Sequence, residues 1–165
     1  MERIRQVEIV DVKELRKLYG SIVDENIPYI LRNSVPSVKE EKRFIQSVVD
    51  SGGTIVVSEG ADGCLIGMLA INRMPHSQLN HRAIFGISVS NPHRGQGIGT
   101  RLIQRAMEWC KEHGVTQLSL EVLSSNPAIS LYEKLGFSKI GENNMGIKLD
   151  DEYHPVLTMA VAIQP

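Results

Sequence analysis

The chain has 165 residues, and 18 Lys and Arg against 19 Asp and Glu give a formal net charge of −1 at pH 7. Hydrophobic residues make up 42% of the chain, which is enough for a single domain over residues 1–165 with a core of its own. The balanced charge argues against a general nucleic-acid-binding protein, since such proteins usually carry a basic excess.

The two cysteines, Cys64 and Cys110, belong to no recognisable metal-binding or redox motif, and no metal is expected. Both fall at apolar positions of the pattern, which predicts two buried free thiols and a reducing, cytoplasmic location. No leader-like segment and no apolar run long enough to span a membrane is recognised, so no membrane partner is expected.

The first third of the chain predicts one strand and two helices. Residues 4–10 alternate as a strand does. Residues 11–14 resemble a capping box, which predicts that a helix starts there, and residues 37–40 predict a second helix in the same way. Residues 24–35, which contain Pro28, receive no assignment.

The remaining two thirds predict mainly strands. Residues 54–58 and 64–72 read as a hairpin around a turn at 60–63, and residues 83–90 read as the next strand after a loop. A helix is expected over 97–113, followed by a strand over 115–122, a short helix after Asn126, and a last strand pair over 137–149 and 156–163 around a turn at 150–152. This order predicts an α/β domain with a mixed, mostly antiparallel sheet flanked by helices.

A glycine-rich loop joins the strand over 83–90 to the helix over 97–113. It reads Arg94, Gly95, Gln96, Gly97, Ile98, Gly99. The first N–H groups of a helix lack partners within the helix, and the helix dipole is positive there, so such a loop is suited to bind phosphate. A dinucleotide fingerprint would need Gly-x-Gly-x-x-Gly and a P-loop would end in Gly-Lys-Ser/Thr, and this loop fits neither.

Arg94-x-x-Gly97-x-Gly99 resembles the pyrophosphate loop of the GNAT family, the GCN5-related N-acetyltransferases, which bind acetyl-CoA. A second block, residues 126–137, is similar to the later family motif Asn-x-x-Ala-x-x-Leu-Tyr-x-x-x-Gly-Phe. In this block Asn126 is expected as the N-cap, Pro127 at the first helical position and Gly136 at the end of the helix.

The resemblance implies acetyl-CoA as cosubstrate, bound where the strand before the glycines and the strand after the long helix splay apart. The family usually has seven residues from its Asn to its Tyr and this chain has six, so either Ser125 or Asn126 takes the family's Asn contact. The implied cofactor-binding residues are Ser88, Val89, Arg94, Gly95, Gln96, Gly97, Ile98, Gly99, Thr100, Ser125, Asn126 and Tyr132. Arg94 has a structural salt bridge as its alternative role.

The implied reaction is direct attack of a primary amine on the thioester, since no Cys/His signature indicates a covalent route. Tyr132 matches the family's general acid near the CoA sulfur, with a purely packed tyrosine as the alternative. Glu121 resembles the Glu of ribosomal-protein N-terminal acetyltransferases, where it acts as a base through water; a solvated carboxylate is equally compatible. His81 and His154 are rival bases, and an amine that arrives neutral needs none.

The family builds its acceptor site from segments that correspond to residues 24–35 and 148–154 here. Acidic residues in these segments favour a cationic amine and Tyr29 favours an apolar side chain, although two solvated loops explain them as well; the acidic residues are Glu25, Asp150, Asp151 and Glu152. The amine belongs to a protein N-terminus, a lysine, an amino acid or a small amine.

Two other functions stay open, a non-catalytic acyl-CoA-binding sensor and a nucleotide-binding regulator that uses the glycine loop. Tyr132 argues against the first, because a pure binder has no need of an acid. The loop spacing argues against the second. The family fold is often paired, so a homodimer is an expectation that rests on the resemblance alone.

Overall fold

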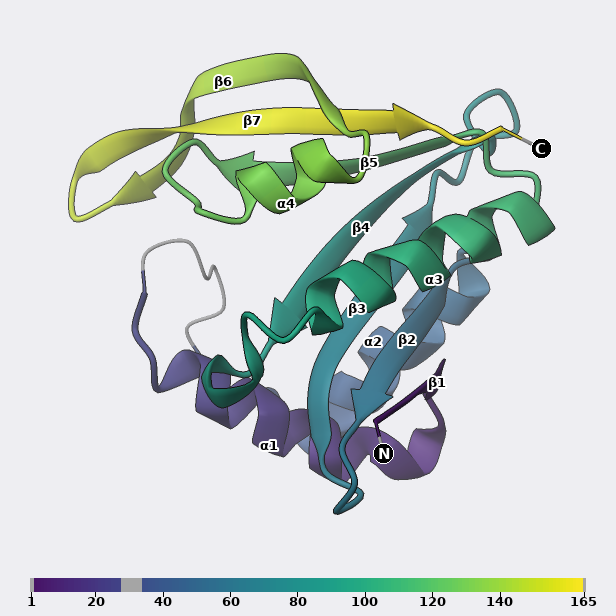
Figure 1. Ribbon diagram of the computed structural model, residues 1–165, viewed down its shortest axis with the longest axis vertical. Helices are drawn as coiled ribbons and strands as arrows, with labels where there is room; N and C mark the ends of the chain where they lie inside the picture. The colour runs from purple at the N-terminus through teal and green to yellow at the C-terminus, as the bar shows by residue number, and fades with distance from the viewer. Residues whose placement is uncertain (1, 28–33, 165) are drawn as a thin grey trace.

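The computed structural model describes residues 2–27 and 34–164 and contains one seven-stranded sheet with helices on both faces (Figure 1). The strands are β1 (Arg3–Gln6), β2 (Thr54–Glu59), β3 (Leu65–Arg73), β4 (Arg82–Val89), β5 (Gln117–Leu123), β6 (Ser138–Leu149) and β7 (Glu152–Ala162). The helices are α1 (Val12–Val23), α2 (Val38–Asp50), α3 (Ile98–Glu112) and α4 (Ile129–Lys134), with short 3-10 turns at η1 (Ile9–Asp11) and η2 (Asn91–His93).

The sheet has the order β1-β2-β3-β4-β5-β7-β6, and only the β4–β5 pair is parallel. That pair is held by three residue pairs, from Arg82 opposite Gln117 to Ile84 opposite Ser119. Beyond Ile84 the two strands diverge, which Figure 1 shows as a fork between β4 and β5. The mixed, mostly antiparallel sheet predicted from the element order is confirmed.

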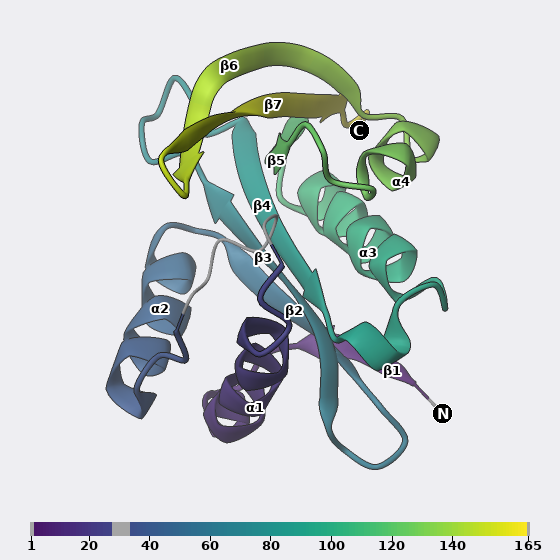
Figure 2. The same cartoon turned by 90° about the vertical axis from the view of Figure 1, so that its left-hand side faces the viewer.

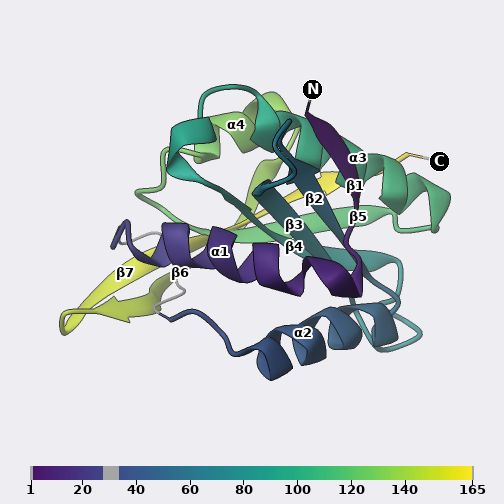
Figure 3. The same ribbon diagram turned by 90° about the horizontal axis from the view of Figure 1, so that it is seen from below.

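The two faces of the sheet carry separate apolar cores. α1 and α2 lie side by side on one face, and α3 and α4 lie on the other (Figures 2 and 3). Leu69 and Leu102 are fully buried on the α3 side, and Leu15 and Val48 are fully buried on the α1–α2 side. Burial of such side chains on both faces fixes which residues of each strand point to which helix layer.

The capping box predicted at residues 37–40 is confirmed. The Ser37 hydroxyl accepts a hydrogen bond from the Glu40 N–H, and the Glu40 carboxylate accepts one from the Ser37 N–H. These bonds satisfy two N–H groups at the N-terminus of α2.

The prediction for the N-terminal segment is wrong in two respects. The strand expected over residues 4–10 ends at Gln6, and the chain then enters the η1 turn, where Val10 is 74% exposed. Asp11 does not cap α1 with its side chain. Instead its carboxylate accepts hydrogen bonds from the Glu8 N–H and from both terminal nitrogens of Arg5, and this folds the chain back after β1.

Three smaller predictions also need correction. Cys64 is exposed, because it closes the turn between β2 and β3 and its carbonyl accepts from the Gly60 N–H; Cys110 is buried as predicted. Pro127 lies in the turn before α4, and the Asn126 Oδ1 accepts from the Ala128 N–H in that turn. Glu152 starts β7 and leaves only Asp150 and Asp151 in the final turn.

Candidate active site

The fork between β4 and β5 opens into two cavities. We call the first the loop-side cavity; it has a volume of about 590 Å³ and lies against the glycine loop and α4. We call the second the sheet-side cavity; it has a volume of about 560 Å³ and is lined from α1, α2 and strands β3 to β7. The two cavities share five lining residues: Ile22, Ile87, Ser88, Asn126 and Tyr132. They therefore meet at one place, beside Tyr132.

Glycine geometry shapes the loop-side cavity. Gly95 and Gly97 have φ of +74° and +78°, a conformation that other residues rarely adopt. A Cβ added to Gly99 would lie 3.3 Å from the Leu131 Cδ2, so glycine allows α3 to approach α4 closely. The first hydrogen bond of α3 runs from the Arg101 N–H to the Gly97 carbonyl, and the N–H groups just before it are the free ones of a helix N-terminus.

Most of the predicted cofactor residues line this cavity. They come from the end of β4, the glycine loop and the segment before and within α4: Ser88, Val89, Arg94, Gly95, Gly97, Ile98, Gly99, Thr100, Asn126 and Tyr132. The cavity also contains His93 and Lys134, which the sequence patterns did not single out. Its charged lining is cationic, which suits a phosphate-bearing ligand.

Gln96 and Ser125 line neither cavity. The Gln96 amide donates to the Pro92 carbonyl, and its own main-chain carbonyl accepts from Arg101, so the residue braces the loop. Ser125 lies exposed in the turn after β5. Asn126 is next to both cavities, which makes it the better placed of the two residues between which the motif left a choice.

Arg94 has a partner in this structure. Its guanidinium makes two hydrogen bonds with the Glu25 carboxylate, at 2.6 and 2.8 Å, and its Nε donates to the Val89 carbonyl at 2.9 Å. Glu25 follows α1, so the ion pair ties the end of α1 to the glycine loop. The salt bridge that was the alternative role of Arg94 is present, at the edge of the loop-side cavity.

Tyr132 is packed where the cavities meet. It is 6% exposed and makes edge-to-face contacts with Phe85 and Phe137, with ring centroids 6.2 Å away in each case. Burial raises the pKa of Tyr132 to about 12, so its hydroxyl keeps its proton at neutral pH. Its oxygen hydrogen-bonds to none of the residues that the structure describes.

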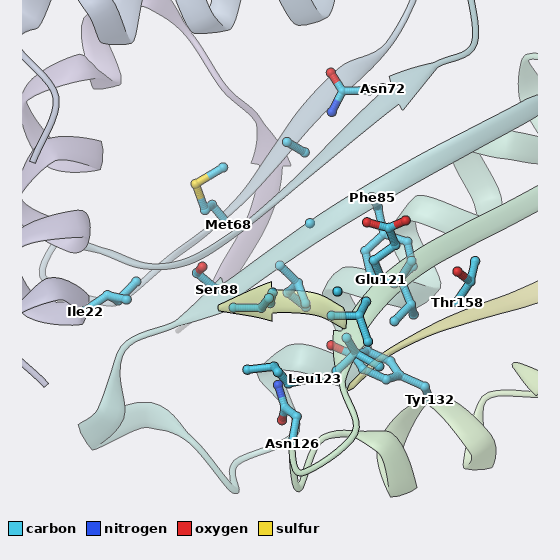
Figure 4. A pocket seen from close by; sticks show the side chains of 18 of the residues that line it. Ile22, Met68, Asn72, Phe85, Ser88, Glu121, Leu123, Asn126, Tyr132 and Thr158 are labelled. Carbon is cyan, nitrogen blue, oxygen red and sulfur yellow. The ribbon is translucent and has the colours of Figure 1, made fainter. Parts of the chain in front are cut away.

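Glu121 projects into the sheet-side cavity from β5. It stands directly opposite Thr158 of β7 and is exposed to solvent through the cavity (Figure 4). Within residues 2–27 and 34–164, its carboxylate has no hydrogen bond and no ion pair. A carboxylate without a counter-charge is available to bind or deprotonate an amine.

The other candidates from the sequence lie elsewhere. His81 and His154 line neither cavity. Glu25 is engaged by Arg94, while Asp150, Asp151 and Glu152 form the tip of the β6–β7 hairpin and line neither cavity. Tyr29 lies outside the described residues.

Several lining residues of the sheet-side cavity were missed. Asn72, Thr158 and Met68 point into it from the strands, and Ile22 from α1 (Figure 4). Asn72 ends an otherwise apolar strand run, and that break was the one available signal in the sequence. The others are ordinary in their strands or helix, and only the fold brings them together.

Among the described residues, no helix is long and apolar enough to cross a membrane. No group of three or more His, Cys, Asp or Glu is placed to hold a metal ion in the part of the chain that the structure describes.

Comparison with known sequences identifies relatives. Residues 21–137 match the model of the acetyltransferase (GNAT) family. An N-alpha-acetyltransferase of Saccharolobus solfataricus is 31% identical over 140 residues, covering 83% of this chain and 80% of that protein. Streptothricin acetyltransferase of Streptomyces lavendulae is 39% identical over 94 residues, covering 56% of this chain and 48% of that protein.

Coverage and structural similarity complete the comparison. For three of the curated relatives, the matched region spans only 26%, 48% and 42% of the relative's length. Among solved structures, a GNAT superfamily phosphinothricin acetyltransferase of Sinorhizobium meliloti in complex with acetyl-CoA superposes with a TM-score of 0.88 at 20% identity, over 98% of this chain and 88% of that one. At that identity the similarity establishes the fold. With the family match over residues 21–137, it follows that the chain belongs to the acetyltransferase (GNAT) family.

Proposed function

We propose that the protein is an N-acetyltransferase that moves an acetyl group from acetyl-CoA to a primary amine by direct attack. One observation carries the proposal: two cavities of suitable size have the same buried tyrosine, Tyr132, in their linings. A transferase needs two substrate sites that meet at the reacting atoms.

The loop-side cavity fits acetyl-CoA. The main-chain N–H groups at the start of α3, together with Arg94 and Lys134, would hold the pyrophosphate and other phosphates. No atom lies within 4 Å of a Cβ added at Gly95, so the loop leaves room for a ligand there. Main-chain groups around Ser88 and Val89, where β4 has left β5, would align the pantetheine arm, and Asn126 supplies an amide beside it.

The cosubstrate supplies an activated acetyl group as a thioester. The amine nitrogen would bond to the thioester carbon, the carbon–sulfur bond would break, and the Tyr132 hydroxyl would give its proton to the leaving sulfur. A raised pKa keeps Tyr132 protonated until that step. Glu121 would accept the proton that the amine loses, directly or through water, and a main-chain N–H near Val89 would stabilise the negative oxygen.

Titration of acetyl-CoA into the purified protein tests the first half of the proposal. Saturable one-site binding that ATP and NAD do not compete away is expected. Binding by ATP instead would favour a nucleotide-binding regulator. No binding by a folded protein would contradict the proposal.

An amine screen tests the second half. Turnover of acetyl-CoA with a primary amine is expected in the wild-type protein and in Tyr153→Phe, a control at an exposed tyrosine of β7 that lines neither cavity. Tyr132→Phe should turn over far more slowly. Tight acetyl-CoA binding without turnover of any amine would favour the acyl-CoA-binding sensor. A cytoplasmic location and a homodimer stay predictions from the sequence.

A further inference from the structure

The sheet-side cavity is lined by charge of one sign. Glu121 is the only residue with a charged side chain among its described lining residues, and no Lys, Arg or His lines it. The nearest cations along β6, Lys139 and Lys148, pair with Glu142 and Asp151. The loop-side cavity is the opposite, because Arg94 and Lys134 line it and no carboxylate is among its described lining residues, although Glu25 pairs with Arg94 at its edge.

A ligand that carries an anion would be poorly held in the sheet-side cavity. Its carboxylate or phosphate would lose water and would find no cationic partner among the described lining residues, and it would face the negative charge of Glu121. A positively charged ligand gains from the same arrangement. The cavity offers neutral hydrogen-bonding groups from Asn72, Asn143 and Thr158, which bind a polar group but do not compensate an anion.

Ser88, Asn126 and the hydroxyls of Tyr19 and Tyr132 add further neutral polar groups, and much of the remaining lining is apolar. Ile22, Phe44, Met68, Leu123, Ile147 and Val156 contribute hydrocarbon or thioether surface. The volume of about 560 Å³ is in the range of sites that take a small molecule, and part of it adjoins the acetyl position beside Tyr132. An acceptor that fills the cavity therefore has a compact hydrocarbon body.

We infer that the acceptor is a compact primary amine with a hydrocarbon body and no carboxylate or phosphate group, and that Glu121 determines this specificity. The inference rests on the proposed function and narrows its acceptor class. This acceptor class excludes free amino acids and contains amines that carry positive charge and no negatively charged group.

Three acceptors with amines of similar basicity test the inference: n-hexylamine, ε-aminocaproate and ε-aminocaproamide. Binding of each to the protein saturated with CoA is measured by calorimetry, and acetylation is measured as kcat/KM. We expect hexylamine and the amide to exceed the acid by about tenfold or more in both measurements. Equal or better use of the acid would overturn the inference, as would failure of all three to bind while a peptide N-terminus is acetylated.

The same experiments distinguish a failure of the proposed function from a failure of the narrower inference about the acceptor. If acetyl-CoA does not bind, the proposed function is wrong. If acetyl-CoA binds and an amine is acetylated, but the acid is used as well as its amide, only the narrower inference is wrong.

Substitutions locate the specificity. Glu121→Gln should bring the hexylamine-to-acid ratio of kcat/KM close to one through changes in KM. Loss of the base role proposed above should also lower kcat, but by the same factor for all three acceptors, so it does not change the ratio. Glu108→Gln removes an exposed carboxylate from α3 outside both cavities and should leave the ratio unchanged. Thr158→Lys, or Asn72→Lys if the first variant fails to fold, should reverse the preference toward the acid. A ratio unchanged in Glu121→Gln and in the lysine variant would contradict the inference.

Discussion

The two cavities that meet at Tyr132 differ in how the chain builds them. The loop-side cavity comes largely from two short continuous segments, the glycine loop with the start of α3 and the segment from Asn126 to α4. The sheet-side cavity is assembled from helices α1 and α2 and from five strands, so its lining residues come from nearly the whole chain. Their charged side chains are also opposite in sign, with Arg94 and Lys134 in one and Glu121 in the other.

This difference distinguishes the loop-side cavity, which a local motif can encode, from the sheet-side cavity, which depends on side chains from many elements. A loop that binds phosphate through main-chain groups depends on glycine positions and helix geometry, which one local motif can encode. A cavity built from side chains on many elements changes with single substitutions that leave the fold intact. Family membership therefore says much about the first cavity and little about the second.

The largest effect is expected at the residue that both cavities share. Tyr132→Phe removes the proton donor but keeps the ring packed between Phe85 and Phe137. We expect kcat to fall by about 100-fold, the lower range for loss of a general acid, while calorimetry shows an unchanged Kd for acetyl-CoA. An unaltered kcat across several pH values would remove Tyr132 from the chemistry.

Two glycine substitutions test the roles of the two cavities independently. Gly99→Val places methyl groups where Leu131 already lies 3.3 Å from the Cβ position, so we expect a loss of about 1–3 kcal/mol in stability, seen as a lower Tm, with weaker acetyl-CoA binding. Gly86→Val has no neighbour within 4 Å of its Cβ position and projects into the sheet-side cavity. It should raise the amine KM and spare the acetyl-CoA Kd; the reverse pattern would show that the cavities are assigned the wrong way round.

Alkaline pH should lower the stability of the folded protein through Tyr132, which lies where the two cavities meet. The pKa of Tyr132 is raised to about 12 by burial, so above its ordinary value of about 10 the unfolded chain loses this proton before the folded one does. Stability is unaffected below about pH 10 and falls by about 1.4 kcal/mol per pH unit up to about pH 12. Chemical unfolding of the wild-type protein and of Tyr132→Phe at several pH values measures this, and parallel curves for the two proteins would contradict it.

The smallest effect is expected at the Arg94–Glu25 ion pair. Arg94→Ala should weaken acetyl-CoA binding about tenfold, the loss of one charge-assisted hydrogen bond. Glu25→Gln releases the guanidinium and should tighten binding by a few-fold, since the carboxylate then no longer competes with phosphate. If both variants weaken binding equally, the ion pair positions the loop and Arg94 does not reach the phosphates.

The sequence predicted the elements well where a local pattern had a local cause. The helix over 97–113 and the box at Ser37–Glu40 depend on neighbours a few residues apart, and the structure contains both. The strand expected over residues 4–10 failed because a distant arrangement decided it: Arg5 draws Asp11 back into a turn. The prediction that Cys64 is buried is wrong for a related reason, since the hairpin turn places this position of the apolar pattern in solvent.

The site divides in the same way. The motif residues of the glycine loop could be located from spacing alone. The lining of the sheet-side cavity could not, because Met68 and Asn72 lie on β3 and Thr158 lies on β7, and only the break that Asn72 makes in an apolar run marks any of them in the sequence. The acidic residues of segments 24–35 and 148–154, which predict a cationic amine, do not line that cavity, and Glu121 is the charged residue among its described lining.

The short parallel pairing between β4 and β5 has a mechanical consequence. Among the residues that the structure describes, three residue pairs are the only direct strand-to-strand link between the β1–β4 half of the sheet and the β5–β7–β6 half. The two halves are joined near Ile84 and diverge beyond it (Figure 1). Both cavities are lined by residues of β4 on one side of this fork and by residues that follow or belong to β5 on the other. A molecule that fills the fork contacts both halves of the sheet and restricts their motion relative to each other. Amide hydrogens of Gly86–Val89 and of Leu120–Leu123 should therefore exchange with deuterium more slowly once CoA is bound, even though the fold has gained no new strand.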